Sequence, residues 1–203
     1  INIPQVKVGL AAACMLFVMG TGVWGYYIPN EYINIDINPS VEIVTNYLNR
    51  VIKIEALNED GKNILVNTNY KNQDYEEAVG KIIESAYDKN YIKNDQDNTV
   101  MVTVTSDNTT KNDYTNKILK EKVEKVTSAK NSPIEIETNS IPVAKYREAK
   151  AQNLSPGKLL LLERLKEVKP NANVADVKNK RVKDIIENIK ERRNIIVNNE
   201  KEK

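Results

Sequence analysis

The residues with the clearest capacity for chemistry are Asn38 and Pro39, which stand side by side in the string DINPSVE. An asparagine side chain usually reacts with the backbone nitrogen of the next residue, but proline has no N–H, so that route is closed. The reverse route stays open: the side-chain amide nitrogen of Asn38 attacks its own backbone carbonyl. This attack forms a C-terminal succinimide and expels the nitrogen of Pro39, which cuts the chain. Nucleophile and carbonyl belong to one residue, so their proximity is supplied covalently.

The uncatalysed reaction is very slow, because an amide nitrogen is a poor nucleophile. A fold can accelerate it by straining Asn38 or by placing hydrogen-bond donors near the Asn38 carbonyl. Asp36 lies two residues earlier on the same predicted strand face and is the candidate for assisting proton transfer. Two other interpretations stay open. The hydroxyl of Ser40 attacks the Pro39 carbonyl and cuts the bond between residues 39 and 40, or Asn-Pro-Ser is an ordinary turn.

The composition excludes most other catalytic chemistry. The 203 residues include no His and one Cys, which removes His-based general acid–base pairs, His-ligated metal sites and an intrachain disulfide. Lys and Arg total 30 and Asp and Glu total 28, for a net charge of +2, and this balance argues against a dedicated nucleic-acid binder. We expect no cofactor, no metal and no multi-turnover enzyme, but a single-turnover self-cleavage.

The acidic residues near Asn38 have a simpler interpretation than catalysis. Glu31, Asp36 and Glu42 are close in sequence and are expected to decorate a solvated strand face. A membrane-tethered hydrolase, which would need paired carboxylates in a protected site, is therefore disfavoured.

Residues 8–28 form an uncharged, largely apolar run of 21 residues, long enough to cross the ~30 Å hydrocarbon core of a bilayer as one helix. The run ends with Trp24, Tyr26 and Tyr27, at the membrane–water boundary where membrane helices carry a belt of aromatic residues. Pro29 then stops the helix. A secretory signal peptide, or a lipoprotein cleavage at Cys14, fits less well because the run exceeds the usual ~7–15 apolar residues.

The flanking charges predict the orientation of this helix. Lys7 precedes it, whereas the first charged residues after it are acidic and no cation occurs before Arg50. Cations remain on the cytoplasmic side, so residues 1–7 are expected to be a cytoplasmic juxtamembrane segment and the rest extracellular. The prediction is a single-pass protein of the cell membrane.

Hydrophobic periodicity predicts an α+β fold in the order β-β-β-α-β-α-β, followed by helices. Strict alternation marks a strand at residues 32–38, and Asn72 is the expected cap of a helix to residue 88. The four residues Asn-Glu-Asp-Gly at 58–61 are interpreted as a turn. The other predicted strands are 41–45, 51–57, 99–105 and 134–137, and the other predicted helices are 113–126 with Tyr114 facing inward, one opened by Pro142, one from Ser155–Pro156 to Val168, and a last one around 182–189.

The string after the predicted membrane helix, YYIPNEYINIDINPSVEIVTNYLNRVIKIEALNEDGKNIL, resembles the membrane-proximal region of RsgI-type anti-sigma factors of Bacillota. The later segment SPGKLLLLERLKEV strengthens the resemblance, which covers residues 7–189. It implies a self-cleaving, SEA-like extracellular domain at residues 29–138, cut between Asn38 and Pro39 into halves that stay associated. Residues 139–191 would be a helical extension and residues 192–203 a linker or disordered tail.

The resemblance also implies partners. A cytoplasmic domain, outside these 203 residues, would hold a sigma factor of the sigma-I class, and a further module would sense extracellular polysaccharide. Separation of the halves would be followed by an intramembrane protease. Direct contact with nucleic acid is not expected.

Two hypotheses of different classes follow. In the first, the chain is a fragment of a transmembrane anti-sigma factor that relays an extracellular signal, and its outer domain is cut but remains docked. The severed strand would be held by backbone hydrogen bonds worth ~0.5–1.5 kcal/mol each and by buried Ile33, Ile35 and Ile37, worth ~1.5–3 kcal/mol each. In the alternative, the chain is a membrane-anchored structural or cell-wall-associated module that is never cut.

Overall fold

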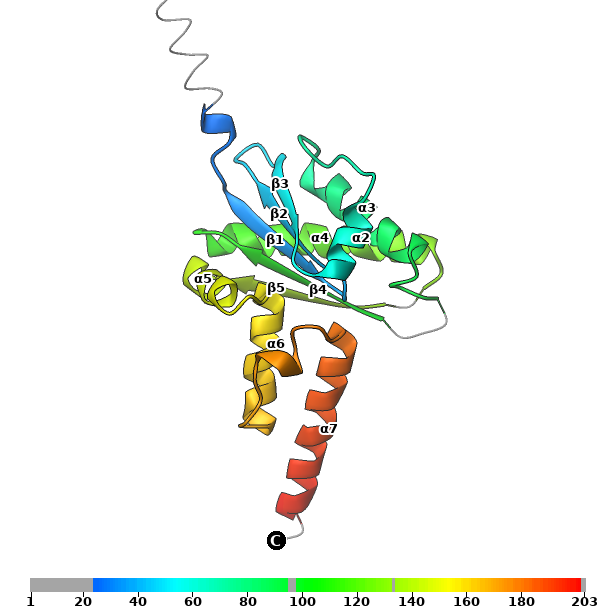
Figure 1. Cartoon of the computed structure of the whole chain (residues 1–203), viewed down its shortest axis with the longest axis vertical. Helices are drawn as coiled ribbons and strands as arrows, with labels where there is room; N and C mark the ends of the chain where they lie inside the picture. The colour runs from blue at the N-terminus through cyan, green and yellow to red at the C-terminus, as the bar shows by residue number, and fades with distance from the viewer. Residues whose placement is uncertain (1–23, 95–97, 133, 202–203) are drawn as a thin grey trace, which may run out of the picture.

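The computed structural model describes residues 24–94, 98–132 and 134–201 and shows a mixed α+β fold built on a five-stranded sheet (Figure 1). The strand order is β3-β2-β1-β4-β5, with antiparallel neighbours except for the parallel pair β4 and β5. The strands are β1 (Glu31–Asp36), β2 (Ser40–Thr45), β3 (Val51–Ala56), β4 (Asn98–Thr105) and β5 (Ile134–Ile141). The helices are α2 (Glu59–Leu65), α3 (Tyr75–Asp88), α4 (Thr109–Ala129), α5 (Val143–Ala151), α6 (Pro156–Val168) and α7 (Val182–Lys201), with a 3₁₀ turn η1 (Val174–Asp176) between the last two.

The predicted membrane helix at residues 8–28 lies almost entirely outside the described residues. Within the described part of the chain, no helix is both long and apolar enough to span a bilayer.

Strand β1 occupies the centre of the sheet, because it is bonded to β2 on one side and to β4 on the other. Ile33 is opposite Ile43 and Val104, and these residues face α3 and α4 in a large apolar core. The i, i+3, i+4 spacing of α3 gives it the matching apolar stripe, formed by Ala78, Val79, Ile82, Ile83 and Ala86. Ile33 is fully buried in this core.

The second face of the sheet is covered by the C-terminal helices. Met101 of β4 joins an apolar cluster made by α6 and α7, and these two helices extend away from the sheet side by side (Figure 1). The helical extension is therefore part of the cover of β1 and β4. Residues 24–28 and the far end of α7 lie at opposite ends of the molecule (Figure 1).

Several predicted boundaries differ from the structure for physical reasons. β1 ends at Asp36, so Asn38 lies in a loop and is not part of the strand. The segment 58–61 is the start of α2 rather than a turn, because the Asn58 side chain caps that helix by accepting from Gly61 N–H. Helix α3 is capped by Asp74 rather than Asn72. α7 continues to Lys201, where a linker or tail was expected.

Helix α4 is longer than predicted, and its predicted inward face is confirmed at Ile118, Val123 and Val126 but wrong at Tyr114. Tyr114, expected to face the core, is 65% exposed, whereas Leu119 and Val123 are fully buried. The polar residues Asn112, Thr115 and Asn116 of the same helix are buried against the sheet, so apolar periodicity alone did not identify the whole packed face.

Candidate functional site

Asn38 and Pro39 lie in the loop that joins β1 to β2. Asp36 is paired with Ser40 across the hairpin, which leaves only residues 37–39 to reverse the chain. The Ile37 N–H donates to the Pro39 carbonyl at 2.9 Å. Asn38 has φ of 103°, a region that L-residues rarely adopt, and a following proline restricts its backbone further. Such a conformation costs about 1–3 kcal/mol and persists only where the surrounding structure enforces it.

The side chain of Asn38 is held at both ends by residues from the start of α2. Its Nδ2 donates to Asp60 Oδ2 at 2.9 Å, and its Oδ1 accepts from Asn58 Nδ2 at 2.8 Å. The other oxygen of Asp60 accepts from the Tyr91 hydroxyl at 3.0 Å. The carboxamide nitrogen, which is the nucleophile of the predicted cut, therefore directs a proton at a carboxylate.

The approach of α2 to the hairpin depends on Asn58 and Gly61. Asn58 Oδ1 accepts from the backbone N–H of both Gly61 and Ser40, at 2.8 and 3.0 Å. A Cβ on Gly61 would lie 2.3 Å from the Ser40 carbonyl oxygen, so a side chain at this position would push α2 away. Residues 58–61 therefore supply the two side chains that hold Asn38, those of Asn58 and Asp60.

Asp36, the predicted assistant, is placed differently from the prediction. It is fully buried on the sheet face opposite to the Ile35 side, under the first turn of α6, where a Cβ on Gly157 would lie 2.6 Å from Asp36 Oδ2. Among the described protein atoms, neither carboxylate oxygen has a well-aligned hydrogen-bond partner, although the Ser40 and Ser155 hydroxyls lie near it. Burial raises the pKa of Asp36, and the Lys158 charge with the nearby Ser40 and Ser155 hydroxyls opposes this in part. The Asn38 side chain is hydrogen-bonded to Asp60 and not to Asp36.

Lys158 connects this buried carboxylate to the C-terminal helices. It is only 2% exposed, and its Nζ donates to the Lys178 carbonyl at 2.6 Å. Burial lowers the pKa of Lys158, whereas the charges of Asp36 and Asp60 raise it. One ammonium group from α6 therefore acts electrostatically on the carboxylates of both β1 and α2.

Helix α7 also reaches the loop. The N–H of Val182, the first residue of α7, donates to the Ile37 carbonyl at 3.1 Å. The residue just before Asn38 is thus bonded to the last helix of the chain.

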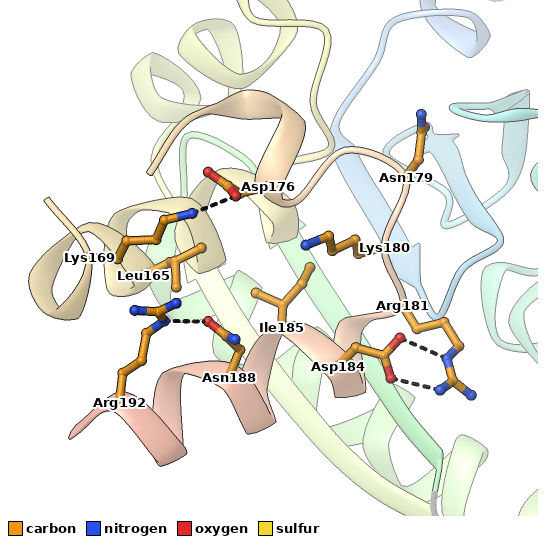
Figure 2. A pocket seen from close by; sticks show the side chains of 10 residues that line it. All are labelled: Leu165, Lys169, Asp176, Asn179, Lys180, Arg181, Asp184, Ile185, Asn188 and Arg192. Atoms are coloured by element: carbon orange, nitrogen blue, oxygen red, sulfur yellow. Dashed lines mark hydrogen bonds and ion pairs between the residues drawn. The ribbon is translucent and has the colours of Figure 1, made fainter. Parts of the chain in front are cut away.

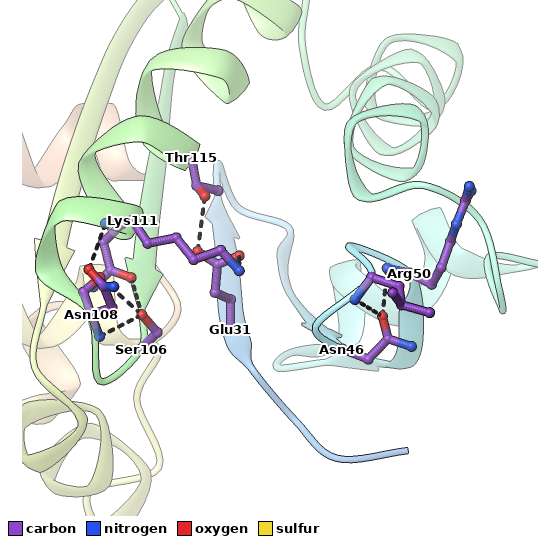
Figure 3. Close-up of polar contacts among 9 residues, drawn as sticks. Glu31, Asn46, Arg50, Ser106, Asn108, Lys111 and Thr115 are labelled. Atoms are coloured by element: carbon purple, nitrogen blue, oxygen red, sulfur yellow. Dashed lines mark hydrogen bonds and ion pairs between the residues drawn. The ribbon is translucent and has the colours of Figure 1, made fainter. Parts of the chain in front are cut away.

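The expectation that Glu31, Asp36 and Glu42 decorate a solvated face is wrong, since their exposures are 0%, 0% and 1%. Glu31 accepts from the Thr115 hydroxyl at 2.9 Å and pairs with Lys111 at 3.1 Å on the α4 side of the sheet (Figure 3). Glu42, on the other face, accepts from the Tyr146 hydroxyl and pairs with the Lys150 ammonium of α5 at 2.9 Å. Buried charges of this kind persist because they are paired.

The Ser40 hydroxyl, the other nucleophile considered, is buried and has no hydrogen-bond partner among the described protein atoms. Asp36 is its cross-strand neighbour and remains the one carboxylate positioned to assist it.

A cavity of about 550 Å³ lies between α6 and α7 (Figure 2), and its lining includes Arg181, the residue before the Val182 that donates to Ile37. Its carboxylates are already paired, with Lys169 Nζ 2.8 Å from Asp176 Oδ1 and Arg181 bonded through two nitrogens to Asp184. In the described part of the chain, no three His, Cys, Asp or Glu side chains gather closely enough to hold a metal ion. The strained and doubly held Asn38 is thus the position best arranged for chemistry.

Comparison with known proteins supports a family relationship. Residues 30–164 match the family model described as the anti-sigma factor RsgI-like central domain. The anti-sigma-I factor RsgI7 of Acetivibrio thermocellus is 38% identical over 187 residues, which cover 91% of this chain and 34% of that protein. RsgI6 of the same organism is 28% identical over 163 residues, 76% of this chain and 21% of that protein. RsgI of Bacillus anthracis is 32% identical over 122 residues, 58% of this chain and 25% of that protein. The chain therefore spans about a third or less of the length of these relatives.

The buried Asp36 carboxylate makes stability depend on pH in a specific direction. Its pKa is raised above the usual 3.8, so between that value and the raised one the folded state binds more protons than the unfolded state. The free energy of unfolding must then fall as pH rises through this window. We expect Asp36→Asn to flatten that fall, as measured by urea unfolding between about pH 4 and pH 8 in chains carrying Asn38→Ala to prevent cleavage. Glu84→Gln, at an exposed site of α3, should keep the original slope; an unchanged slope in Asp36→Asn would contradict the assignment.

Proposed function

The chain belongs to the family of RsgI-like anti-sigma factors, and from this premise we propose that it relays an extracellular signal across the cell membrane by being cut between Asn38 and Pro39. The proposal extends to the whole protein, in which a cytoplasmic domain holds a sigma factor of the sigma-I class, as the names of the relatives suggest. Residues 8–28 cross the membrane once, with the N-terminus in the cytoplasm. An extracellular polysaccharide sensed by another module, and an intramembrane protease that acts after the halves part, complete the proposed pathway.

The observation that carries this proposal is the state of Asn38, with φ of 103° and its carboxamide bridged between Asn58 and Asp60. Strain of about 1–3 kcal/mol, if released on the way to the transition state, accelerates a reaction roughly 5- to 160-fold. A fixed side chain adds to this effect where it holds the amide nitrogen close to the Asn38 carbonyl carbon, because proximity lowers the entropic part of the barrier. Both effects would accelerate a cut that an isolated Asn-Pro pair undergoes very slowly.

The steps of the cut follow from these contacts. Asn38 Nδ2 bonds to the Asn38 carbonyl carbon and passes one proton to the Asp60 carboxylate. The bond from that carbon to the Pro39 nitrogen then breaks, and this nitrogen takes the proton back from Asp60. The products are a succinimide at residue 38, which water later opens, and a free secondary amine at Pro39.

After the cut, β1 belongs to a short N-terminal fragment and its neighbours belong to the long one. The fragment is held by two ladders of backbone bonds, to β2 and β4, and by Ile33 and Ile35 in the main core. The face toward α5 and α6 is different. There, Asn34, Asp36 and Thr103 are buried with side-chain atoms that have no hydrogen-bond partner among the described protein atoms.

A buried polar group that stays unpaired costs about 1–3 kcal/mol, and at Asp36 the nearby Ser40 and Ser155 hydroxyls and the Lys158 charge offset part of this cost. The apolar face of β1 is therefore expected to hold the fragment more firmly than the polar face, which suits a connection that persists at rest and parts under load. A purely apolar contact on both faces would hold the fragment far more firmly.

Replacement of the nucleophile tests the cut itself. We expect Asn38→Ala to remain a single chain, whereas the unsubstituted chain gives a short fragment ending at residue 38 and a long one beginning at Pro39. Intact-mass spectrometry distinguishes these products. Asn49→Ala is the control, because Asn49 also has positive φ (59°) but lies in the β2–β3 turn; it should cut normally. A long fragment that begins at Ser40 would support the hydroxyl route, and an uncut unsubstituted chain the structural alternative.

Replacement of the proton acceptor tests the role of Asp60. General-base assistance contributes about 10²–10⁴-fold to a rate, so Asp60→Asn should slow the appearance of the Pro39 amine by about 10²-fold or more. The neighbouring Glu59 is exposed and paired with Lys62, which makes Glu59→Gln the matched control with an unchanged rate. Equal rates in the two variants would remove Asp60 from the mechanism.

The bond from Val182 to Ile37 tests how the cut fragment is retained. Val182→Pro deletes the N–H donor at the first helical position, where proline is tolerated, while Val182→Ala keeps the donor and loses packing. We expect the proline variant to release the short fragment faster than the alanine variant, because only it loses the bond to Ile37. Release is measured as loss of the long fragment from a surface that holds the short one. Faster release from the alanine variant would show that packing of α7, and not this bond, retains the fragment.

A further inference from the structure

The turn between β2 and β3 exposes large apolar side chains where polar ones are usual. Tyr47 and Leu48 are 69% and 67% exposed, although the centres of turns favour Gly, Asn, Asp, Ser and Pro. Trp24 and Tyr27, just before β1, are 71% and 50% exposed. These four residues are here called the aromatic tip.

Asn46 joins the two halves of the aromatic tip. Its Nδ2 donates to the Tyr26 carbonyl at 2.9 Å, which ties the turn to the segment that precedes β1. Its Oδ1 accepts from the backbone N–H of Leu48 and of Arg50, at 2.9 and 3.0 Å, the second drawn in Figure 3. Every polar atom of this buried side chain is used. These hydrogen bonds fix the backbone of the turn, so that the side chains of Tyr47 and Leu48 point into solvent from a defined position.

Further contacts fix the other side of the tip. The Tyr26 hydroxyl donates to Asn72 Oδ1, and the Lys71 ammonium lies 5.7 Å from the centre of the Tyr27 ring. Lys71 and Arg50 are both exposed. An exposed apolar centre flanked by cations matches the boundary between acyl chains and phosphate groups.

We propose that the aromatic tip inserts into the headgroup region of the phospholipid bilayer, so that the β2–β3 turn is a second membrane contact of the outer domain. The inference rests on the proposed membrane anchoring, because the uncharged run of residues 8–28 ends beside this turn. Trp and Tyr are enriched at this depth, where one end of each ring is apolar and the other is wet. A second copy of the chain or a protein partner would require no such continuity with the apolar run.

This contact has a consequence for the cut protein. Tyr47 and Leu48 belong to the long fragment, whereas Trp24 and Tyr27 belong to the short one. The long fragment would hold the membrane by its own residues, at the end of β1 opposite to Asn38. The six residues of β1 place the cut about 20 Å farther from the bilayer.

Lipid quenching of a single indole tests the proposal on the full chain in phosphatidylcholine nanodiscs. Trp24→Phe removes the only tryptophan, and Tyr47→Trp places an indole on the turn. The control is Ile195→Trp in the same background, because Ile195 is 58% exposed near the far end of α7. We expect lipids brominated on their acyl chains to remove most of the fluorescence of the Tyr47→Trp chain and to leave that of the control unchanged.

The possible results distinguish docking of the β2–β3 turn from anchoring of the chain in the membrane. Equal, weak quenching in both chains, with the protein still bound to the nanodisc, would overturn docking of the turn and leave the membrane anchor standing. Failure of the chain to remain with the nanodisc would overturn the anchor and, with it, the docking. Cleavage, followed by mass in the same samples, reports separately on the cut.

Discussion

The strained backbone of Asn38, which the surrounding structure enforces, is the constraint on which the proposed function depends. Two strands that are fixed by the sheet on both sides are joined through residues 37–39, and Pro39 has a fixed φ. The rest of the change in chain direction takes place at Asn38, which adopts φ of 103°. The conformation is enforced from three directions, by the sheet, by the start of α2 through Asn58 and Asp60, and by α7 through its bond to Ile37. Release from any one of them would let the loop relax and would lower its reactivity.

In the proposed function, one element would serve both cleavage and release. β1 carries the reactive loop at one end and the connection toward the predicted membrane helix at the other. Since residues 24–28 and the far end of α7 lie at opposite ends of the molecule (Figure 1), a pull on α7 is transmitted across the length of the sheet. The ladders beside β1 resist this pull, and the poorly satisfied polar face under α6 reduces the resistance. In the proposed function, α6 and α7 are the elements through which load would reach the severed strand.

Part of this site could be predicted from the sequence. Asn-Pro has a distinctive chemistry that needs no structure, and the alternating isoleucines of residues 33–37 correctly placed β1 in a sheet. Asn58 and Asp60 were missed because Asn-Glu-Asp-Gly has the composition of a turn, and only the tertiary contact shows that its side chains reach Asn38. The sequence signal that could have identified them was Asn58 as a helix N-cap, since a short helical segment follows it.

The buried charges could not be predicted from local pattern. Alternation separates the two faces of a strand, but it does not reveal that α5 and α6, more than 100 residues later, cover the polar one. Asp36 and Glu42 were therefore assigned to solvent, and Lys158 had no visible partner. In α4, Asn and Thr side chains are buried beside the apolar stripe of Leu119 and Val123, and Tyr114 was assigned to the wrong face.

The most direct test of the account is whether folding itself starts the cut. Freshly synthesised chain is captured in urea, then either kept unfolded or diluted into folding buffer, and the masses are followed over time. The account predicts that the amine of Pro39 appears only after dilution, with kinetics that follow the recovery of structure. Cleavage at the same rate in urea, or an intact chain long after folding is complete, would contradict it.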